Sequence, residues 1–241
     1  MLQWSASQLI VLPITLLIIL LITLTCYLFL NKTNHKNAPL KIIAITVVIL
    51  EIIKQVKNIS IGFDPYDLPF HYCSLFVFLF PLAQFGNEKT KKIINPVTFA
   101  CALTVTIGIY LTPSSIISSS CDNIFANFYL FHTFTFHHLV ILYTIISITL
   151  YTYVPKKNDY LLAGGAIAIY GIIGITFSYL LNSNYCNFLR SCLSFLEEWR
   201  LKVGQVPYVL VIYFAIIGGT IFSSFMYYLI SIKLLKRKTD A

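Results

Sequence analysis

The sequence predicts an all-α, polytopic membrane protein, folded as a single domain over residues 1–241 with a bundle of seven transmembrane helices. Hydrophobic residues make up 58% of the chain and charged residues 11%, whereas an ordinary soluble domain has about 45–50% and about 25%. Seven apolar stretches are also long enough to cross a bilayer, because a spanning helix needs about 20 residues. This composition argues against a soluble, disordered or nucleic-acid-binding protein. Six cysteines are too sparse for a disulfide scaffold.

The predicted spans follow one another with short polar loops between them. They cover residues 8–30, 39–60, 68–86, 93–112, 125–153, 160–181 and 205–232. The first lacks a basic leader and is too long for a signal peptide core, so we interpret it as an anchored helix. The second is the least apolar because it contains Glu51, Lys54 and Lys57. The fifth is longer than one crossing requires, so we expect it to tilt or to extend beyond the bilayer.

Prolines and acidic residues mark the start of the third span. Asp64-Pro65 and Asp67-Leu68-Pro69 precede it. An Asp cap followed by a proline in the first turn is typical of a helix start. The sequence therefore predicts a helix from residue 68, with His71 and Cys73 in its first turns.

The distribution of basic residues predicts the orientation. Most Lys and Arg residues lie in the loops after the first, third and fifth spans and in the C-terminal tail. Cytoplasmic loops carry such an excess, so we expect the N-terminus outside and the C-terminus in the cytoplasm of a multi-pass cell-membrane protein. The net charge of +8 then reflects topology rather than a basic ligand.

Ionisable residues inside spans predict a functional site. Glu51 and Lys54 are three residues apart, so they share one helix face and can pair. The pair fits two interpretations. It is either a neutralised ion pair that fixes helix packing, or a site that orients a polar head group or relays a proton.

Four of the five histidines fall in the third and fifth spans. His132, His137 and His138 lie on the fifth, and His71 lies on the third. At about 100° per residue, His132 is about 140° from His137 and about 120° from His138, so the three cannot all face one small site. Their clustering predicts a polar site in the outer half to the middle of the membrane. Cys73 is either its nucleophile or a small hydrophobic residue.

The loop before the last span is polar and aromatic. Asn184 and Tyr185 either cap helices or line the mouth of a site. Cys121, Cys186 and Cys192 fall on the predicted outer side. A disulfide between Cys121 and one of the other two is an open alternative that spacing does not assign.

Cofactor motifs are missing. The chain has no P-loop, no G-x-G-x-x-G and no C-x-x-C, so we expect no cofactor and no metal. A zinc site built from His71, Cys73 and one fifth-span histidine is the alternative, although no standard ligand spacing is present.

Four short motifs carry a family resemblance. Leu68-Pro69-Phe70-His71-Tyr72-Cys73 resembles the L-P-L-H-x-C signature of the YwaF family of bacterial integral membrane proteins. Leu111-Thr112-Pro113 is similar to its L-T-P, His138 to its fifth-span histidine, and Asn184-Tyr185 to its N-Y. The matches run in the family's order, and the family also has seven spans. Ser74 departs from the pattern, because the family often has Asp there.

The resemblance implies an activity. The YwaF family is similar to animal transmembrane protein 164, an acyltransferase acting on ether phospholipids, in which the H-x-C cysteine carries the acyl group. This implies a nucleophilic Cys73 with His138 as its histidine partner, and phospholipid acyl chains as the substrate. Donors to the developing oxyanion would be His71, Asn184 or Tyr185. The remaining candidates for lining the site are His132, His137, Glu51 and Lys54.

Two other functions remain open on the sequence. The polar residues would also suit a small-molecule transporter or ligand-binding membrane protein, with Glu51, Lys54 and the histidines in a polar cavity. In a structural or assembly subunit the same residues would only pack helices.

Overall fold

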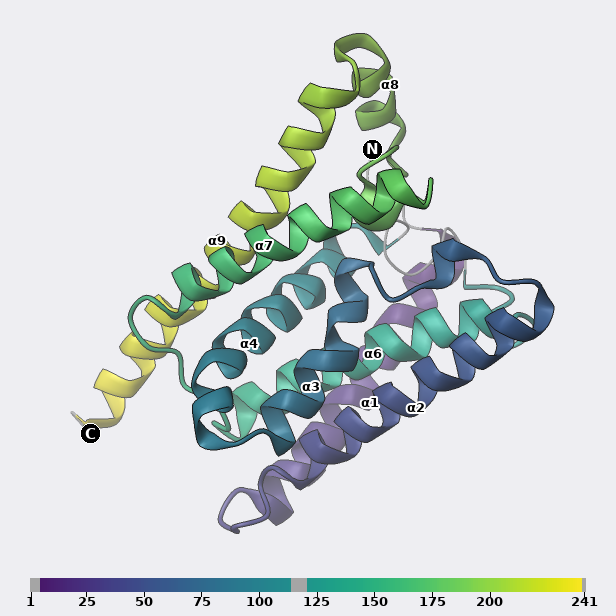
Figure 1. Ribbon diagram of the computed structural model, residues 1–241. Coiled ribbons are helices and arrows are strands. Elements are labelled where there is room, and N and C mark those ends of the chain that lie inside the picture. The colour runs from purple at the N-terminus through teal and green to yellow at the C-terminus, as the bar shows by residue number, and fades with distance from the viewer. Residues whose placement is uncertain (1–4, 114–120, 240–241) are drawn as a thin grey trace.

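The computed structural model describes residues 5–113 and 121–239, shown as a ribbon in Figure 1. These residues form helices and connecting segments without any strand, so the all-α prediction is confirmed. The α-helices are α1 (Ala6–Leu30), α2 (Ala38–Ile61), α3 (Phe76–Phe85), α4 (Glu88–Leu111), α6 (Phe128–Thr149), α7 (Asp159–Leu180), α8 (Ser194–Val203) and α9 (Gln205–Thr239). Short 3-10 helices are η1 (Pro65–Asp67), η2 (Tyr72–Leu75) and η3 (Tyr185–Asn187).

Within the described part of the chain, five helices are long and apolar enough to cross a membrane. They are α1, α4, α6, α7 and the segment Gln205–Ile232 of α9. Their outer surfaces expose large apolar side chains such as Leu17, Ile169 and Phe214, which would be costly in water but not in lipid. The chain is therefore a multi-pass membrane protein. The count of seven spans stays a prediction, because the charged residues of α2 and the shortness of α3 keep these two helices out of the set of five. The orientation of the termini also stays a prediction.

The third predicted span is not one helix. The segment runs through η1, a turn and η2 before α3 begins at Phe76. Asp64 does cap a helix start, accepting from the amide of Tyr66 at 2.9 Å, but only that of η1. Proline disfavours the helical conformation in the residue before it, and Leu68, which precedes Pro69, is extended. The prediction of a helix from residue 68 is therefore wrong, and Cys73 lies in a 3-10 turn.

Other helix boundaries differ from the sequence-based prediction because of caps. α6 begins after Asn127, whose side chain accepts from the amides of Tyr129 and Leu130 at 2.9 and 3.4 Å. It ends at Thr149, so the predicted stretch of 125–153 is too long at both ends. α4 likewise begins earlier than predicted, at Glu88, after the Asn87 cap.

α4 lies at the centre of the bundle. It packs against α3, α6, α7 and α9, while α2 packs against α3 and α6. α1 packs against α6, and α7 packs against α9. Figure 1 shows α7 and α9 along one side of the bundle and α1 and α2 along the other. This arrangement brings the ends of α2, α4 and α7 and the starts of α6 and α9 to one end of the molecule.

Candidate functional site

A cavity of about 710 Å³ opens at the end of the bundle where α2 and α4 end. Its volume lies within the range of about 300–1,000 Å³ that is usual for ligand sites. Six predicted site residues line it: Glu51, Lys54, His71, Cys73, His132 and His137. Apolar side chains of α4, α6 and α9 complete the wall, namely Val105, Phe136, Ile212, Ala215 and Ile216. The cavity thus combines a polar cluster with an apolar surface.

The irregular segment before α3 supplies the wall that holds Cys73. Tyr170 of α7 donates a hydrogen bond to the carbonyl of His71 at 3.0 Å. The hydroxyl of Tyr72 lies 3.0 Å from that of Thr220 on α9. The thiol of Cys186 donates to the carbonyl of Phe70 at 3.6 Å. Since the backbone here is not helical, these side-chain contacts hold its polar groups in place.

The ring of His71 is held in one orientation. Its Nε2 lies 3.0 Å from the carbonyl of Tyr66, so Nε2 carries the proton and Nδ1 does not. The rings of Tyr66 and Tyr185 pack edge-on against it, with centroids 4.6 and 5.2 Å away. A neutral His71 therefore offers an acceptor rather than a free donor, which does not favour its predicted role as an oxyanion donor.

His137 presents an unprotonated nitrogen on the wall that faces the same cavity as Cys73. Its Nδ1 lies 2.7 Å from the carbonyl of Thr133, so the proton sits on Nδ1. The residue is 3% exposed. No hydrogen bond to its Nε2 is formed by the residues described, which leaves this nitrogen able to accept a proton.

His138 points elsewhere. Its Nδ1 donates to the carbonyl of Phe134 at 2.7 Å, and its Nε2 lies 3.0 Å from the hydroxyl of Thr15 on α1. It does not line the cavity that holds Cys73. The structure therefore brings His132 and His137 into the cavity and turns His138 towards α1.

Glu51 is the centre of a buried polar cluster. Its carboxylate lies 2.9 Å from Lys54 Nζ and accepts from Gln55 Nε2 at 2.7 Å. The same Gln55 nitrogen donates to the carbonyl of Asp67 at 2.7 Å, which ties α2 to η1. His132 Nε2 lies 3.6 Å from the other Glu51 oxygen. The predicted Glu51–Lys54 pair is therefore formed, and it faces the cavity rather than the lipid.

Two buried polar atoms of the cavity wall have no hydrogen-bond partner among residues 5–113 and 121–239. They are Nε2 of His132, a residue 5% exposed, and the hydroxyl of Tyr129. An unpaired buried polar group costs about 1–3 kcal/mol. His132 Nε2 still lies 3.6 Å from Glu51, so the Tyr129 hydroxyl is the group that favours a polar ligand in this part of the cavity.

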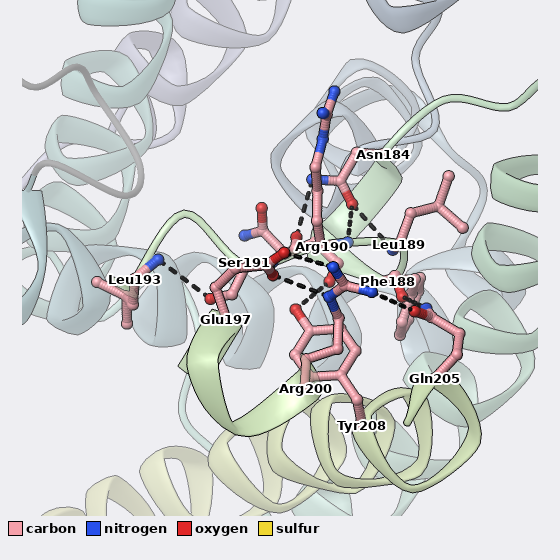
Figure 2. Close-up of polar contacts among 11 residues, drawn as sticks. Asn184, Phe188, Leu189, Arg190, Ser191, Leu193, Glu197, Arg200, Gln205 and Tyr208 are labelled. Carbon is pink, nitrogen blue, oxygen red and sulfur yellow. Dashed lines mark hydrogen bonds and ion pairs between the residues drawn. The ribbon is translucent and has the colours of Figure 1, made fainter. Parts of the chain in front are cut away.

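Asn184 and Tyr185 shape the loop instead of lining the cavity. In Figure 2 the Asn184 side chain lies across its loop. Its Nδ2 donates to the carbonyl of Arg190 at 2.9 Å, and its Oδ1 accepts from the amide of Leu189 at 2.9 Å. The hydroxyl of Tyr185 donates to the carbonyl of Pro65. Their polar atoms are engaged with the backbone, so the geometry does not place them as oxyanion donors.

The loop and α8 form a second wall that sequence reasoning missed. Glu197 accepts from the amide of Ser191 at 2.8 Å and from Arg200 Nε at 2.9 Å (Figure 2). The Arg200 guanidinium lowers the pKa of Glu197 to about 2. Leu193 and Leu196, beside this ion pair, line the cavity. The only signal in the sequence was Glu197 and Arg200 at the i,i+3 spacing of a helix.

Disulfide and zinc alternatives find no support in the geometry. All six cysteines are free thiols. Cys121 is buried, whereas Cys192 is exposed and lines the cavity. Among the described residues, no three His, Cys, Asp or Glu side chains are grouped so that they could hold a metal ion. The disulfide predicted as an alternative is therefore not formed.

Fold and cavity together define a class: a multi-pass, all-α membrane protein with a mixed polar and apolar cavity near one end of the bundle. Within that class, the chain belongs to the TMEM164 family, which it matches over residues 3–230. Comparisons with curated proteins and with solved structures give no match.

Proposed function

We propose that this protein, as a YwaF-type member of its family, is a cell-membrane acyltransferase that carries a phospholipid acyl chain as a thioester on Cys73. The observation that supports this most is that one cavity holds a free thiol, a histidine with an unprotonated nitrogen and an apolar wall. Thiol, base and lipid-compatible surface are the three parts that acyl transfer through cysteine requires.

The reaction has two balanced steps. His137 Nε2 takes the Cys73 proton, and the thiolate attacks the ester carbonyl of the donor lipid. The ester C–O bond breaks, the thioester forms, and the proton passes from His137 to the departing alkoxide of the lysolipid. A second lipid hydroxyl then gives its proton to His137 and attacks the thioester. The C–S bond breaks, and the Cys73 thiolate takes the proton back from His137.

His137 is the base that this cavity favours. The resemblance implies His138 in that role, but His138 is bonded to Thr15 of α1 and does not line the cavity. The unpaired Tyr129 hydroxyl is the polar group available to the substrate's ester or head group, while His132 Nε2 faces Glu51 at 3.6 Å. Glu51 and Lys54 would then fix His132 on the cavity wall.

The test is covalent labelling of the purified protein with a phospholipid that carries a labelled acyl chain. We expect a hydroxylamine-sensitive label on the wild type and none on Cys73→Ala. Cys186→Ala and Cys192→Ala are matched controls, because both thiols line the same cavity. Label that survives in folded Cys73→Ala and disappears in either control would overturn the assignment.

A second function is favoured by one observation: the Glu51, Lys54 and His132 cluster lines the cavity. A transporter or ligand-binding protein would use it to couple substrate and proton movement. Accumulation of a substrate by proteoliposomes that Glu51→Gln abolishes and Cys73→Ala leaves intact would support this alternative over acyl transfer.

A further inference from the structure

We propose that a second cavity, at the opposite end of the bundle, binds an anionic phosphate group. This cavity of about 140 Å³ lies where α2 and α4 begin and where α3 and α6 end. Its polar lining includes Lys41, Gln84, Lys91, Asn95, Tyr143 and Ser147. It shares no lining residue with the cavity that holds Cys73. The two sites are therefore separate, and this inference does not depend on the proposed acyl transfer.

The charge of this second cavity is positive. Lys41 and Lys91 lie one turn inside the starts of α2 and α4. The starts of α2 and α4 favour an anion and the ends of α3 and α6 at the same cavity oppose it, so the two lysines supply the positive charge. Of the residues described, no carboxylate lines this cavity. Glu88 lies 3.4 Å from Lys91, but it is almost fully exposed, and such pairs contribute little.

Buried donors face the same space. Ser147 is 2% exposed, and it lines the cavity. The hydroxyl of Tyr143 accepts from Gln84 Nε2 at 2.7 Å, so its own hydrogen remains available to donate. The hydroxyls of Ser147 and Tyr143 add donors to those of the two lysines, which suits a ligand with acceptor atoms.

The ligand must be compact and rich in acceptors. A volume of about 140 Å³ is below the range of about 300–1,000 Å³ typical of drug-sized ligands, so the cavity suits a single polar group. Phosphate oxygens accept charge-assisted bonds from lysine and ordinary ones from hydroxyls. The predicted orientation places this end in the cytoplasm, where basic pockets between helices bind anionic lipid head groups. Lipid phosphate and soluble phosphate share this chemistry.

The experiment measures binding to the purified full chain through the rise in its unfolding temperature, because a ligand of the native state stabilises it. The probes are inorganic phosphate and dihexanoyl phosphatidic acid, with zwitterionic dihexanoyl phosphatidylcholine for comparison, all at one ionic strength. We expect a saturable rise with an anionic probe. The double variant Lys41→Gln/Lys91→Gln should raise its Kd by about tenfold or more.

The matched control removes the same charge from the same end of the protein. Lys89→Gln/Lys92→Gln changes two exposed lysines of α4 that do not line the cavity, so its Kd should stay within about twofold. Ser147→Ala removes no charge and should weaken binding several-fold only if the ligand enters the cavity.

The outcomes are distinct. Saturable binding of inorganic phosphate supports a soluble anion, and binding of phosphatidic acid alone supports a lipid head group. Equal affinity for phosphatidylcholine, equal losses in the two double variants, or no saturable shift with either anionic probe would overturn the proposal.

Discussion

At the scale of single residues, two adjacent histidines on α6 have opposite surroundings. His137 faces the cavity of Cys73, and His138 faces Thr15 of α1. We predict that His137→Gln lowers the rate of acyl transfer by about 100-fold or more, since general base catalysis contributes about that much. His138→Gln should leave the rate within about threefold, because Gln keeps a polar group near Thr15.

The measurement is the single-turnover rate of thioester formation for both variants. An equal loss of rate in the two variants would contradict the assignment of His137 as the base. A loss of rate in His138→Gln alone would favour His138, as the resemblance implied.

Glu197 provides a pH prediction at the same scale. Its pKa lies at about 2, below the ordinary 4.5, because Arg200 donates to the charged carboxylate. A carboxyl with a lowered pKa stabilises the fold fully above its ordinary pKa, and this contribution is lost as pH falls from about 4.5 towards about 2. The unfolding temperature of Glu197→Gln should therefore lie below that of the wild type at pH 7, and the gap should narrow at pH 3. A gap that is constant with pH would show that the charge is not responsible.

The site residues could be predicted only in part. Glu51 and His71, which line the cavity, were predicted because ionisable side chains are rare inside spans, and Cys73 because of the motif Leu68-Pro69-Phe70-His71-Tyr72-Cys73. The sequence could not tell which histidine faces the cavity. His137 and His138 differ by about 100° in direction, and the packing of α6 against its neighbours decides which of its faces lines the cavity. For Asn184 and Tyr185 the sequence left helix capping and site lining open, because the backbone carbonyls that they contact are brought close only by the fold.

At the scale of helices, α7 and α9 approach closely through glycine. A Cβ added at Gly171 would lie 2.7 Å from the ring of Tyr213, whereas one at Gly165 on the same helix would meet nothing within 4 Å. Gly171→Ala should destabilise the protein by about 1–3 kcal/mol through overpacking. Gly165→Ala should be neutral or stabilising by up to about 1 kcal/mol, because alanine favours helix. Unfolding temperatures of both variants in detergent test this, and equal effects would contradict it.

The helices themselves show what the sequence determines locally. Long apolar runs such as those of α1 and α7 were predicted within two residues at each end, because length and hydropathy suffice there. The segment before α3 was predicted wrongly, since its prolines and the tyrosines that hold it act over distances that a local pattern does not contain. The short helix α8 was missed because ten mixed residues give no spanning signal.

At the scale of the whole molecule, the predicted orientation has a direct test. If the N-terminus is outside, the exposed thiol of Cys192 is on the outer side. A membrane-impermeant maleimide should then label Cys192 in intact cells, and Cys192→Ser should lose that label. Labelling that appears only after permeabilisation would reverse the orientation, and with it the side assigned to each cavity.

The contact between α1 and α6 has a consequence for assembly of the bundle. In lipid, a uniformly apolar helix gains little from turning one face rather than another towards its neighbour. The hydroxyl of Thr15 is bonded to His138 within the otherwise apolar middle of α1. Thr15→Val would leave insertion intact but remove this bond, so the rotation of α1 would then depend on polar contacts at its start, such as that of Ser7 with the amide of Cys121.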